Sequence, residues 1–441
     1  EDESSAEPIR LFFCGHHQRQ AEDGQINAIV VCYGKVGEST GSGVDVWRPR
    51  AQITVDECNR RLLNQQVSSI DSAGKQQMLC RAPAADIASI HQNEKMMQPD
   101  QTALPGRVEN VEELEELLSR PSDELIEDLA RVEGDLLILG GSGKVGPTLA
   151  RMARRAAPQK QIVAVSRFSD LSVRDRLNSW KVDTICCDLF DRDAVGRLPR
   201  LPNVIFMVGR KFGTTGLERL TWATNVYVPS IVAETFAASN IIAFSTLCVY
   251  PFADVSGPGW GETAPVGPIG EYANSCVGRE RVFQYFSEQN DTPGRLMRLN
   301  YAIDLRYGAL HDVASRVWRR QPVDVTTPLV NVIWQGDAIE QILRALRHCT
   351  VATSPLNIGS PDHISIETLA RAFGERFGRE LTLTGRPAGS AWINDTSQAT
   401  NLFGPPVIGL DRMIDWTADW ISREMPGYDK PTRYEVRDGR F

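Results

Sequence analysis

Short apolar runs separated by helical patterns characterise the chain from residue 134 onward. Five such runs are predicted as strands: 136–139, 162–165, 184–187, 204–208 and 241–245. Segments between them, such as 148–155, carry apolar residues at helical spacing. Continuous apolar strands that alternate with helices indicate a parallel sheet covered on both faces. Because crossovers between parallel strands are right-handed, the sequence predicts a doubly wound α/β fold of the Rossmann type.

The chain before residue 134 has a different pattern. Residues 1–95 are predicted to form a separate small module of unknown role, with a strand at 26–33 and a helix that begins at Thr54. Residues 96–133 then read as a linker followed by acidic amphipathic helices. These two helices are predicted at 111–118 and 123–132.

Composition supports a folded chain of more than one domain. With 441 residues, 42% hydrophobic and 24% charged, the chain is close to globular averages, which excludes disordered and membrane-embedded classes. No apolar run approaches the roughly 18 residues that a membrane span needs. The net charge of −8, with both signs interspersed, gives no indication of nucleic-acid binding. The chain begins with Glu1, so we expect it to be processed or incomplete. We expect a cytoplasmic location, although residues 1–95 leave an exported or organellar context open.

Nine cysteines are present, and none has the C-x-x-C spacing of a zinc site. The first four (Cys14, Cys32, Cys58 and Cys80) are compatible with either two disulfides or plain thiols. The other five (Cys186, Cys187, Cys248, Cys276 and Cys349) lie in apolar stretches and are expected to be buried, reduced thiols. The adjacent His16 and His17 are interpreted as part of a solvated turn, so no metal site is predicted.

The first predicted strand leads directly into a glycine-rich turn. Gly140, Gly143 and Gly146 recur at every third position before a helix. Such glycines permit the tight turn, the approach of backbone N–H groups to a pyrophosphate, and close packing of helix on strand. The anion would then lie at the positive end of the helix dipole. The predicted dinucleotide-binding loop comprises Gly140, Gly141, Ser142, Gly143, Lys144, Val145 and Gly146.

The end of the second strand indicates which dinucleotide is bound. NAD sites usually have an acidic residue there, whereas this chain has Ser166 and Arg167. An arginine pairs well with a 2′-phosphate, so NADP(H) is favoured and NAD(H) remains possible. Alternatively, Arg167 stacks on the adenine or lies in solvent. Asp188, after the third strand, is expected near the adenine amino group.

Several motifs, taken in chain order, resemble the extended short-chain dehydrogenase/reductases, the NAD-dependent epimerase/dehydratase family. The resemblance covers roughly residues 134–425 and includes the glycine spacing of the loop. It also rests on Asn225 and on the segments 244–250, 271–280, 298–300, 330–337 and 356–359. The resemblance implies a nucleotide-binding domain and a smaller C-terminal substrate lobe. The implied boundaries are 134–300 with 330–350 for the former, 301–329 with 351–425 for the latter, and 426–441 for a C-terminal tail.

The resemblance implies that Tyr272 exchanges a proton with the substrate oxygen and that Thr246 hydrogen-bonds the same oxygen. The family activates this tyrosine with a lysine one helical turn later, because a cation lowers a tyrosine pKa. Here that position is Cys276, and a neutral thiol cannot replace an ammonium. One of the nearby cations Arg279, Arg210 and Lys211 is a candidate replacement. A thiolate at Cys276, or simple loss of the lysine, are the alternatives.

The resemblance also implies the remaining contacts. Cofactor contacts are expected from Leu189, Val208, Gly209, Arg210, Lys211 and Cys276, and substrate contacts from Asn300, Tyr301, Arg306 and Tyr307. Arg306 is interpreted either as a binder of carboxylate or phosphate or as a member of a surface ion pair. A homodimer through the helices that carry Asn225 and Tyr272 is possible. Val232, Phe236, Val282, Phe283 and Phe286 would then form the interface, or else be buried within the monomer.

Two classes of function stay open. Leu247 and Cys248 follow Thr246 where sugar dehydratases of the family have an acidic pair, so water elimination is disfavoured. The expected reaction is hydride transfer, in a redox or epimerisation step, on a sugar-like or small hydroxylated or carbonyl substrate. The alternative is a non-catalytic dinucleotide-binding protein with a structural or sensing role, which the missing lysine favours.

Overall fold

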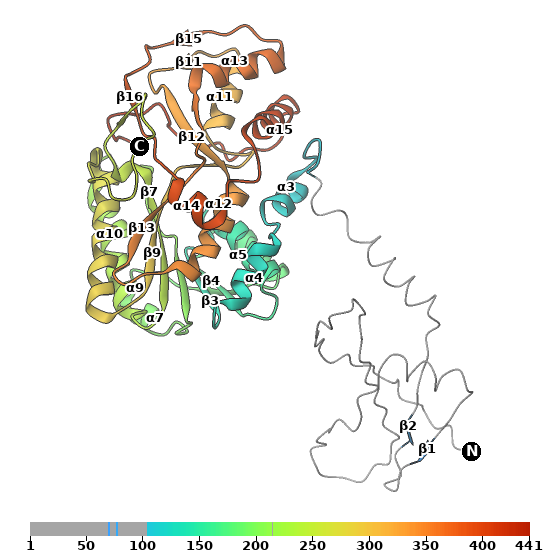
Figure 1. The fold of residues 1–441 in the computed structure, drawn as a ribbon, viewed down its shortest axis with the longest axis vertical. Coiled ribbons are helices and arrows are strands. Elements are labelled where there is room, and N and C mark those ends of the chain that lie inside the picture. The colour runs from blue at the N-terminus through green and yellow to red at the C-terminus, as the bar shows by residue number, and fades with distance from the viewer. Residues whose placement is uncertain (1–68, 71–75, 78–103, 214) are drawn as a thin grey trace, which may run out of the picture. The chain divides into compact units, whose positions relative to one another are not determined.

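The computed structural model describes residues 104–213 and 215–441, together with the backbone of two short strands, β1 (Ser69–Ile70) and β2 (Gln76–Gln77). The chain divides into two units, Glu1–Leu104 and Pro105–Phe441 (Figure 1). In the first unit, β1 and β2 pair in antiparallel fashion. The strand predicted at 26–33, the helix predicted at Thr54, His16, His17 and the first four cysteines lie outside the described residues.

The second unit is built on a seven-stranded sheet. Its strands are β3 (Leu136–Leu139), β4 (Ile162–Ser166), β5 (Asp183–Cys186), β6 (Asn203–Phe206), β7 (Asn240–Thr246), β9 (Gly294–Leu299) and β13 (Ser354–Ile358). They lie in the order β13-β9-β7-β6-β3-β4-β5, and every pair is parallel. This order confirms the predicted doubly wound fold. From β3 the chain adds β4 and β5 on one side and then returns to add β6 on the other side. Folds of this type bind ligands at such a point, where the order of strands reverses.

Helices cover both faces of this sheet (Figure 1). One face packs against α4 (Asp123–Arg131), α5 (Gly146–Ala156), α6 (Leu171–Ser179) and α12 (Gln335–Arg344). The other packs against α7 (Arg192–Gly196), α9 (Val228–Thr235) and α10 (Gly270–Asn290). Successive residues of a strand point to opposite faces of the sheet, so each face has its own core. Ile138 and Ile205 lie in the core of the first face, and Leu139 and Phe206 lie in the core of the second.

The two acidic helices expected before the sheet are present as α3 (Val111–Leu118) and α4. Each begins with a side-chain cap: Asn110 accepts a hydrogen bond from Glu113 N–H, and Ser122 accepts one from Leu125 N–H. Leu114, Leu118, Leu125 and Leu129 are buried, as the helical spacing of their apolar residues predicts.

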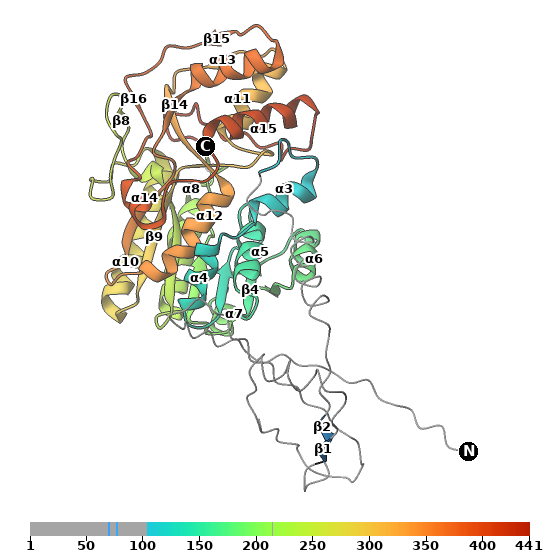
Figure 2. The same ribbon diagram turned by 45° about the vertical axis from the view of Figure 1, so that its right-hand side comes forward.

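A smaller lobe lies beyond the carboxyl ends of the sheet strands (Figure 2). It contains α11 (Ala309–Trp318), α13 (Ile366–Phe377) and α15 (Leu410–Ser422), whereas α14 (Ser397–Phe403) packs on α12 and β13 in the first core of the large sheet. The strands of the smaller lobe are β10 (Tyr301–Ile303), β12 (Leu329–Trp334) and β14 (His363–Ser365) in one sheet, and β11 (Val323–Asp324) with β15 (Leu383–Thr384) in another. The pair β8 (Ala253–Asp254) and β16 (Ser390–Ala391) connects the segment after β7 to this lobe.

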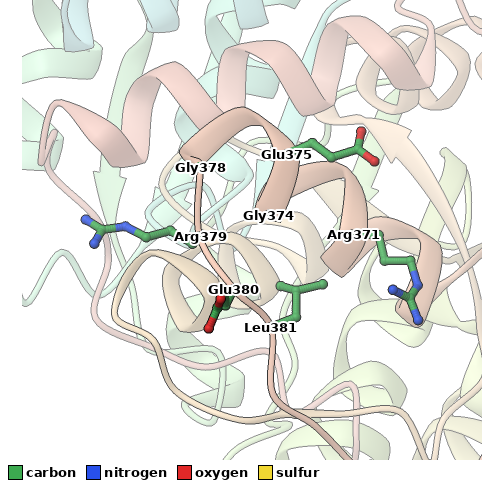
Figure 3. A pocket seen from close by; sticks show the side chains of 7 residues that line it. All are labelled: Arg371, Gly374, Glu375, Gly378, Arg379, Glu380 and Leu381. Carbon is green, nitrogen blue, oxygen red and sulfur yellow. The ribbon is translucent and has the colours of Figure 1, made fainter.

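A surface hollow of about 380 Å³ lies at the C-terminal end of α13 (Figure 3). It is lined by Arg371, Gly374, Glu375, Gly378, Arg379, Glu380 and Leu381. None of these residues belongs to the predicted site, and the two arginine side chains point to opposite sides. Over the described part of the chain, no helix has the length and apolar character needed to cross a membrane. The same residues contain no cluster of His, Cys, Asp and Glu that could hold a metal ion.

Candidate functional site

The glycine-rich loop between β3 and α5 has the geometry of a phosphate cradle. Gly140 has a φ of +96°, a conformation that favours glycine, and its N–H donates to Val165 O at 2.8 Å. A Cβ on Gly146 would lie 2.5 Å from Gly141 O, so any larger residue would push α5 away from the loop. The first turn of α5 has no side-chain cap, which leaves its N–H groups for an anion. These residues fit a dinucleotide pyrophosphate.

The end of β4 is connected to this loop through two hydroxyls. Ser142 Oγ and Ser166 Oγ lie 2.5 Å apart. Arg167, the next residue, is exposed. Beyond β5, Asp188 is exposed and accepts a hydrogen bond from Phe190 N–H at 3.1 Å, whereas Leu189 is buried. The residues predicted to hold the adenosine half of the cofactor thus lie at the carboxyl ends of neighbouring strands.

Tyr272 lies in the first turn of α10, and Cys276 lies one turn later with no exposed surface. Burial raises the pKa of Tyr272 well above its usual value, and the neighbouring Cys276 and Cys248 add to this effect. Arg279 and a hydrogen bond with Thr246 oppose it. Burial likewise raises the pKa of Cys276 to about 11. The phenol and the thiol are therefore both protonated at neutral pH.

Buried polar contacts fix the position of α10. Glu280 and Arg298 of β9 form an ion pair at 2.7 Å, with side chains at most 4% exposed. The Ser245 hydroxyl of β7 donates to Glu280 Oε1 at 2.6 Å. Thr246, the next residue on β7, lies at the strand end with its Oγ1 accepting Cys248 N–H at 3.2 Å. The helix that carries Tyr272 is thus held in register with the strand that carries Thr246.

Asn225 connects α10 to the loop after β6. It lies in a π-helical turn, η1 (Ala223–Tyr227), between α8 (Glu218–Trp222) and α9. Its Oδ1 accepts Arg210 N–H at 2.8 Å, and its Nδ2 donates to Ser275 Oγ at 2.8 Å. Arg279 donates to the same Oδ1 at 2.7 Å and to Phe244 O at 2.9 Å. The Arg279 guanidinium also lies so close to Gly209 that a Cβ there would be 2.8 Å from Arg279 Nη2.

We call the hydrogen bonds that Asn225 makes with Arg210, Ser275 and Arg279 the Asn225 clamp. Lys211 follows directly after Arg210. Lys211 is half-buried, and its burial lowers its pKa. Cys248 and Cys276 are among the groups close enough to act on it electrostatically. Its Nζ donates to Thr432 O at 3.4 Å and lies 4.5 Å from the centre of the Phe441 ring. Among the cations considered from sequence, Lys211 and Arg279 both interact electrostatically with Cys276, and Arg279 also donates to Asn225 and Phe244. The Arg210 side chain donates to Gly213 O at 2.9 Å.

Lys144 extends from the glycine loop toward the second lobe. Its Nζ lies 3.4 Å from the centre of the Tyr307 ring. Burial, with Lys211 and Arg306 nearby, lowers the pKa of Lys144 to about 7, although Asp304 and Asp312 act in the opposite direction. Lys144 is nevertheless an exposed residue, so solvent screens part of these interactions. Lys144 is therefore a weakly held positive charge next to the phosphate cradle.

Of the four expected substrate residues, Tyr307 lies against Lys144, and the other three have different surroundings. Asn300 is buried and donates to Asn331 Oδ1 at 3.1 Å and Asn394 Oδ1 at 2.7 Å. Tyr301 is half-buried, near Cys248 and Tyr307. Arg306 pairs with Asp304 at 2.6 Å and with Glu115 of α3 at 2.7 Å. Both pairs are buried, so Arg306 belongs to an interior ion-pair cluster rather than to a surface ion pair.

Two further predictions concern side chains near these helices. Val232, Phe236 and Phe283 are buried within the monomer, in the core beneath α9 and α10. The large apolar residues that remain exposed on α8, η1 and α10 are Leu220, Trp222, Tyr227 and Tyr285.

All five described cysteines are free; Cys187, Cys248 and Cys276 are buried and Cys349 is half-buried. The burial expected for Cys186 is wrong, because β5 is an edge strand and leaves it exposed.

The sequence did not indicate Thr432 and Phe441 as site residues. Both lie in the segment 426–441, where no periodicity or motif points to a role. Their approach to Lys211 depends on how the segment folds back over the site. Phe441 is 3% exposed, and its ring contacts the Tyr272 ring edge-on at 5.6 Å.

The fold and this arrangement define a dinucleotide-binding protein of the Rossmann class. Residues 136–359 match the NAD dependent epimerase/dehydratase family, and the chain belongs to this family. The resemblance identified from the motifs is thereby confirmed. A search of the curated proteins found no match.

Solved structures with a similar fold include sugar-nucleotide enzymes. UDP-glucuronic acid 4-epimerase from Bacillus cereus, in complex with UDP-glucuronic acid and NAD, is 18% identical with a TM-score of 0.57, and the alignment covers 66% of this chain and 99% of that one. UDP-glucose 4-epimerase from Thermotoga maritima, with UDP-glucose, is 17% identical with a TM-score of 0.55 and the same coverage. dTDP-glucose 4,6-dehydratase from Bacillus anthracis, in complex with NAD, is 12% identical with a TM-score of 0.57 and covers 66% and 97%.

Proposed function

We propose that this chain is an NAD(P)-dependent oxidoreductase or epimerase that acts on a sugar-like or small hydroxylated or carbonyl substrate. The observation that carries the proposal is the position of Lys211, whose Nζ lies 4.5 Å from the centre of the Phe441 ring, which in turn packs on the Tyr272 ring at 5.6 Å. An ammonium delivered from the loop after β6 would take the place of the lysine that the family has on the tyrosine helix. The site would then keep its cation although the helix has lost it.

Each residue has a definite role in this proposal. The glycine loop and the uncapped first turn of α5 would hold the pyrophosphate, and Lys211 would donate to the nicotinamide ribose. The bound nicotinamide would exchange a hydride with the substrate carbon. Tyr272, which is protonated at neutral pH, would donate its proton to the carbonyl oxygen as the hydride arrives, and Thr246 would hydrogen-bond that oxygen. In the reverse direction Tyr272 has to lose its proton first, which the Lys211 charge would favour.

We favour NADP(H) over NAD(H) as the cofactor. The support is the absence of a carboxylate at the end of β4, where Ser166 is followed by the exposed Arg167. An exposed guanidinium is well suited to pair with a 2′-phosphate. Asp188 would remain available to the adenine amino group.

One observation favours the second candidate, a dinucleotide-binding protein without catalysis. The Tyr272 ring is covered by Phe441, and its pKa is raised rather than lowered. A phenol that never ionises and never meets a substrate would leave only cofactor binding. The same arrangement is compatible with catalysis if substrate enters beside the phenol oxygen.

Turnover of the full chain separates the two candidates. We would incubate it with NAD⁺ or NADP⁺ and a panel that begins with UDP-glucose and UDP-glucuronic acid, the ligands of two similar structures, and continues with simple sugars and hydroxy acids. Products would be followed by NMR and by absorbance at 340 nm. Catalysis predicts a product that Tyr272→Phe abolishes while Tyr285→Phe, an exposed tyrosine of the same helix, leaves turnover unchanged. Cofactor binding with no product from any substrate would favour the second candidate.

A further inference from the structure

The segment 426–441, called here the C-terminal strap, runs from the second lobe to the helix that carries Tyr272. Tyr428 N–H donates to Arg306 O at 3.1 Å, near the start of the strap. Thr432 donates from its N–H and its hydroxyl to Asp312 of α11, at 2.7 and 2.5 Å. Arg437 donates to Ser390 O of β16 at 2.9 Å. The strap is thus attached to three separate parts of the second lobe.

The far end of the strap packs on the start of α10. Gly439 and Gly270 approach so closely that a Cβ on either residue would lie within 3 Å of the backbone of the other. Both have positive φ values, +74° and +80°, which favour glycine. Phe441 follows and packs its ring against Tyr272 at 5.6 Å and against Trp392 at 6.1 Å. This close backbone contact determines where the Phe441 ring lies.

The strap also provides partners for the Lys211 ammonium. One is the carbonyl oxygen of Thr432, and another is the face of the Phe441 ring. A half-buried cation gains from an oxygen acceptor and from an aromatic face, since both offset its lost hydration. The Phe441 ring therefore contacts the proposed replacement cation on one side and the proposed proton donor on the other.

The strap is attached too firmly to act as a removable cover. Tyr434 and Phe441 are at most 3% exposed, and Thr432 is 2% exposed. Releasing the strap would expose two buried aromatic side chains and leave Asp312 without its two donors. We expect it to stay in place when cofactor binds.

We infer that Phe441 is a positioning residue for Lys211: its ring holds the ammonium beside Tyr272, so that the C-terminal strap forms part of the nicotinamide end of the site. This inference rests on the proposed function, because it takes the Lys211 ammonium to be the group that binds the nicotinamide ribose. It assigns a role at the site to a segment outside the matched residues 136–359.

The test compares two ligands that share the adenosine half. ADP reaches the glycine loop but has no nicotinamide ribose, whereas NADH has both. Calorimetric titration of the full chain with each ligand would be run on wild type, Phe441→Ala and Lys211→Met. The exposed neighbour Arg440→Ala serves as the matched control. Phe441→Ala is expected to weaken NADH binding about tenfold, the effect of one charge-assisted hydrogen bond, with ADP affinity and the control unchanged.

The double variant Phe441→Ala/Lys211→Met distinguishes positioning from an independent contact. If Phe441 acts through Lys211, the double variant binds NADH no more weakly than Lys211→Met alone. Additive losses, an unchanged NADH affinity in Phe441→Ala, or a tighter one as expected of a blocking residue would each overturn the inference. Phe441→Trp, which keeps an aromatic face, should restore most of the loss. A wild type that binds ADP and NADH equally well would show instead that the nicotinamide half makes no contact, and absence of turnover in the substrate panel would separately show failure of the proposed catalytic function.

Discussion

Arg279 donates a hydrogen bond from Nη2 to Asn225 Oδ1 at 2.7 Å, and both side chains are buried. The same oxygen accepts Arg210 N–H, so one amide joins the tyrosine helix to the loop that carries Lys211. The π-helical turn around Asn225 provides this geometry, as such turns often do at functional sites. The relative position of Lys211 and Tyr272 depends on this contact.

Asn225→Ala should therefore affect both stability and cofactor binding. It leaves the buried Arg279 guanidinium and Arg210 N–H without their acceptor, a loss of about 2–4 kcal/mol in the free energy of unfolding. Urea denaturation would measure it, with Thr224→Ala of the same turn as control. NADH affinity should fall more than ADP affinity if, as we propose, Lys211 of the loop after β6 binds the nicotinamide ribose. A loss below about 0.5 kcal/mol, the size of an ordinary surface substitution, would contradict the clamp.

We expect cofactor affinity to depend on pH through the protonation of Lys144. Its pKa is lowered to about 7, so the free protein loses this charge as the pH rises through 7. A bound pyrophosphate stabilises the ammonium, so binding should take up a proton above pH 7 and weaken as the pH rises to 9. NAD⁺ is a suitable ligand for calorimetry between pH 6 and 9, since its phosphates do not titrate there. Lys144→Arg, which stays charged, should give a flat profile; the same slope in that variant would assign the effect to another group.

We expect Arg167 to affect the affinity for NADPH but not the affinity for NADH. Arg167→Ala should weaken NADPH binding about tenfold and leave NADH binding unchanged, because only NADPH carries the 2′-phosphate that a guanidinium would pair with. Calorimetric titration with both cofactors measures the difference, and Arg174→Ala on α6, whose side chain is 42% exposed, is a control. Equal losses for NADH and NADPH would remove Arg167 from cofactor selection.

The sheet was predictable from sequence because each of its first five strands is a continuous apolar run. Leu136–Leu139 and Asn203–Phe206 are fully buried between two layers of helices, and the predicted and observed bounds differ by at most two residues. The prediction that Cys186 is buried was wrong, because an apolar run does not indicate which strand lies at the sheet edge. The glycine spacing identified the loop, since its geometry is a local property of the chain.

The site itself was predictable only in part. Tyr272, Thr246 and Lys211 follow from local motifs or from their place after a strand. Asn225 binds Arg279 of α10 and the backbone of Arg210, next to Lys211, through contacts between elements that sequence spacing does not reveal. Phe441 lies 169 positions from Tyr272 in sequence, and only the path of the strap brings the two rings together.

We propose that Lys211 supplies the ammonium that position 276 lacks. The most direct measurement is NADH affinity in three variants: Lys211→Met, Cys276→Lys, and the two combined. The account predicts that Lys211→Met loses about tenfold in NADH affinity with ADP affinity unchanged, and that adding Cys276→Lys restores it. NADH affinity that is unaffected by Lys211→Met, or a loss that Cys276→Lys does not repair while the variant still binds ADP, would contradict it.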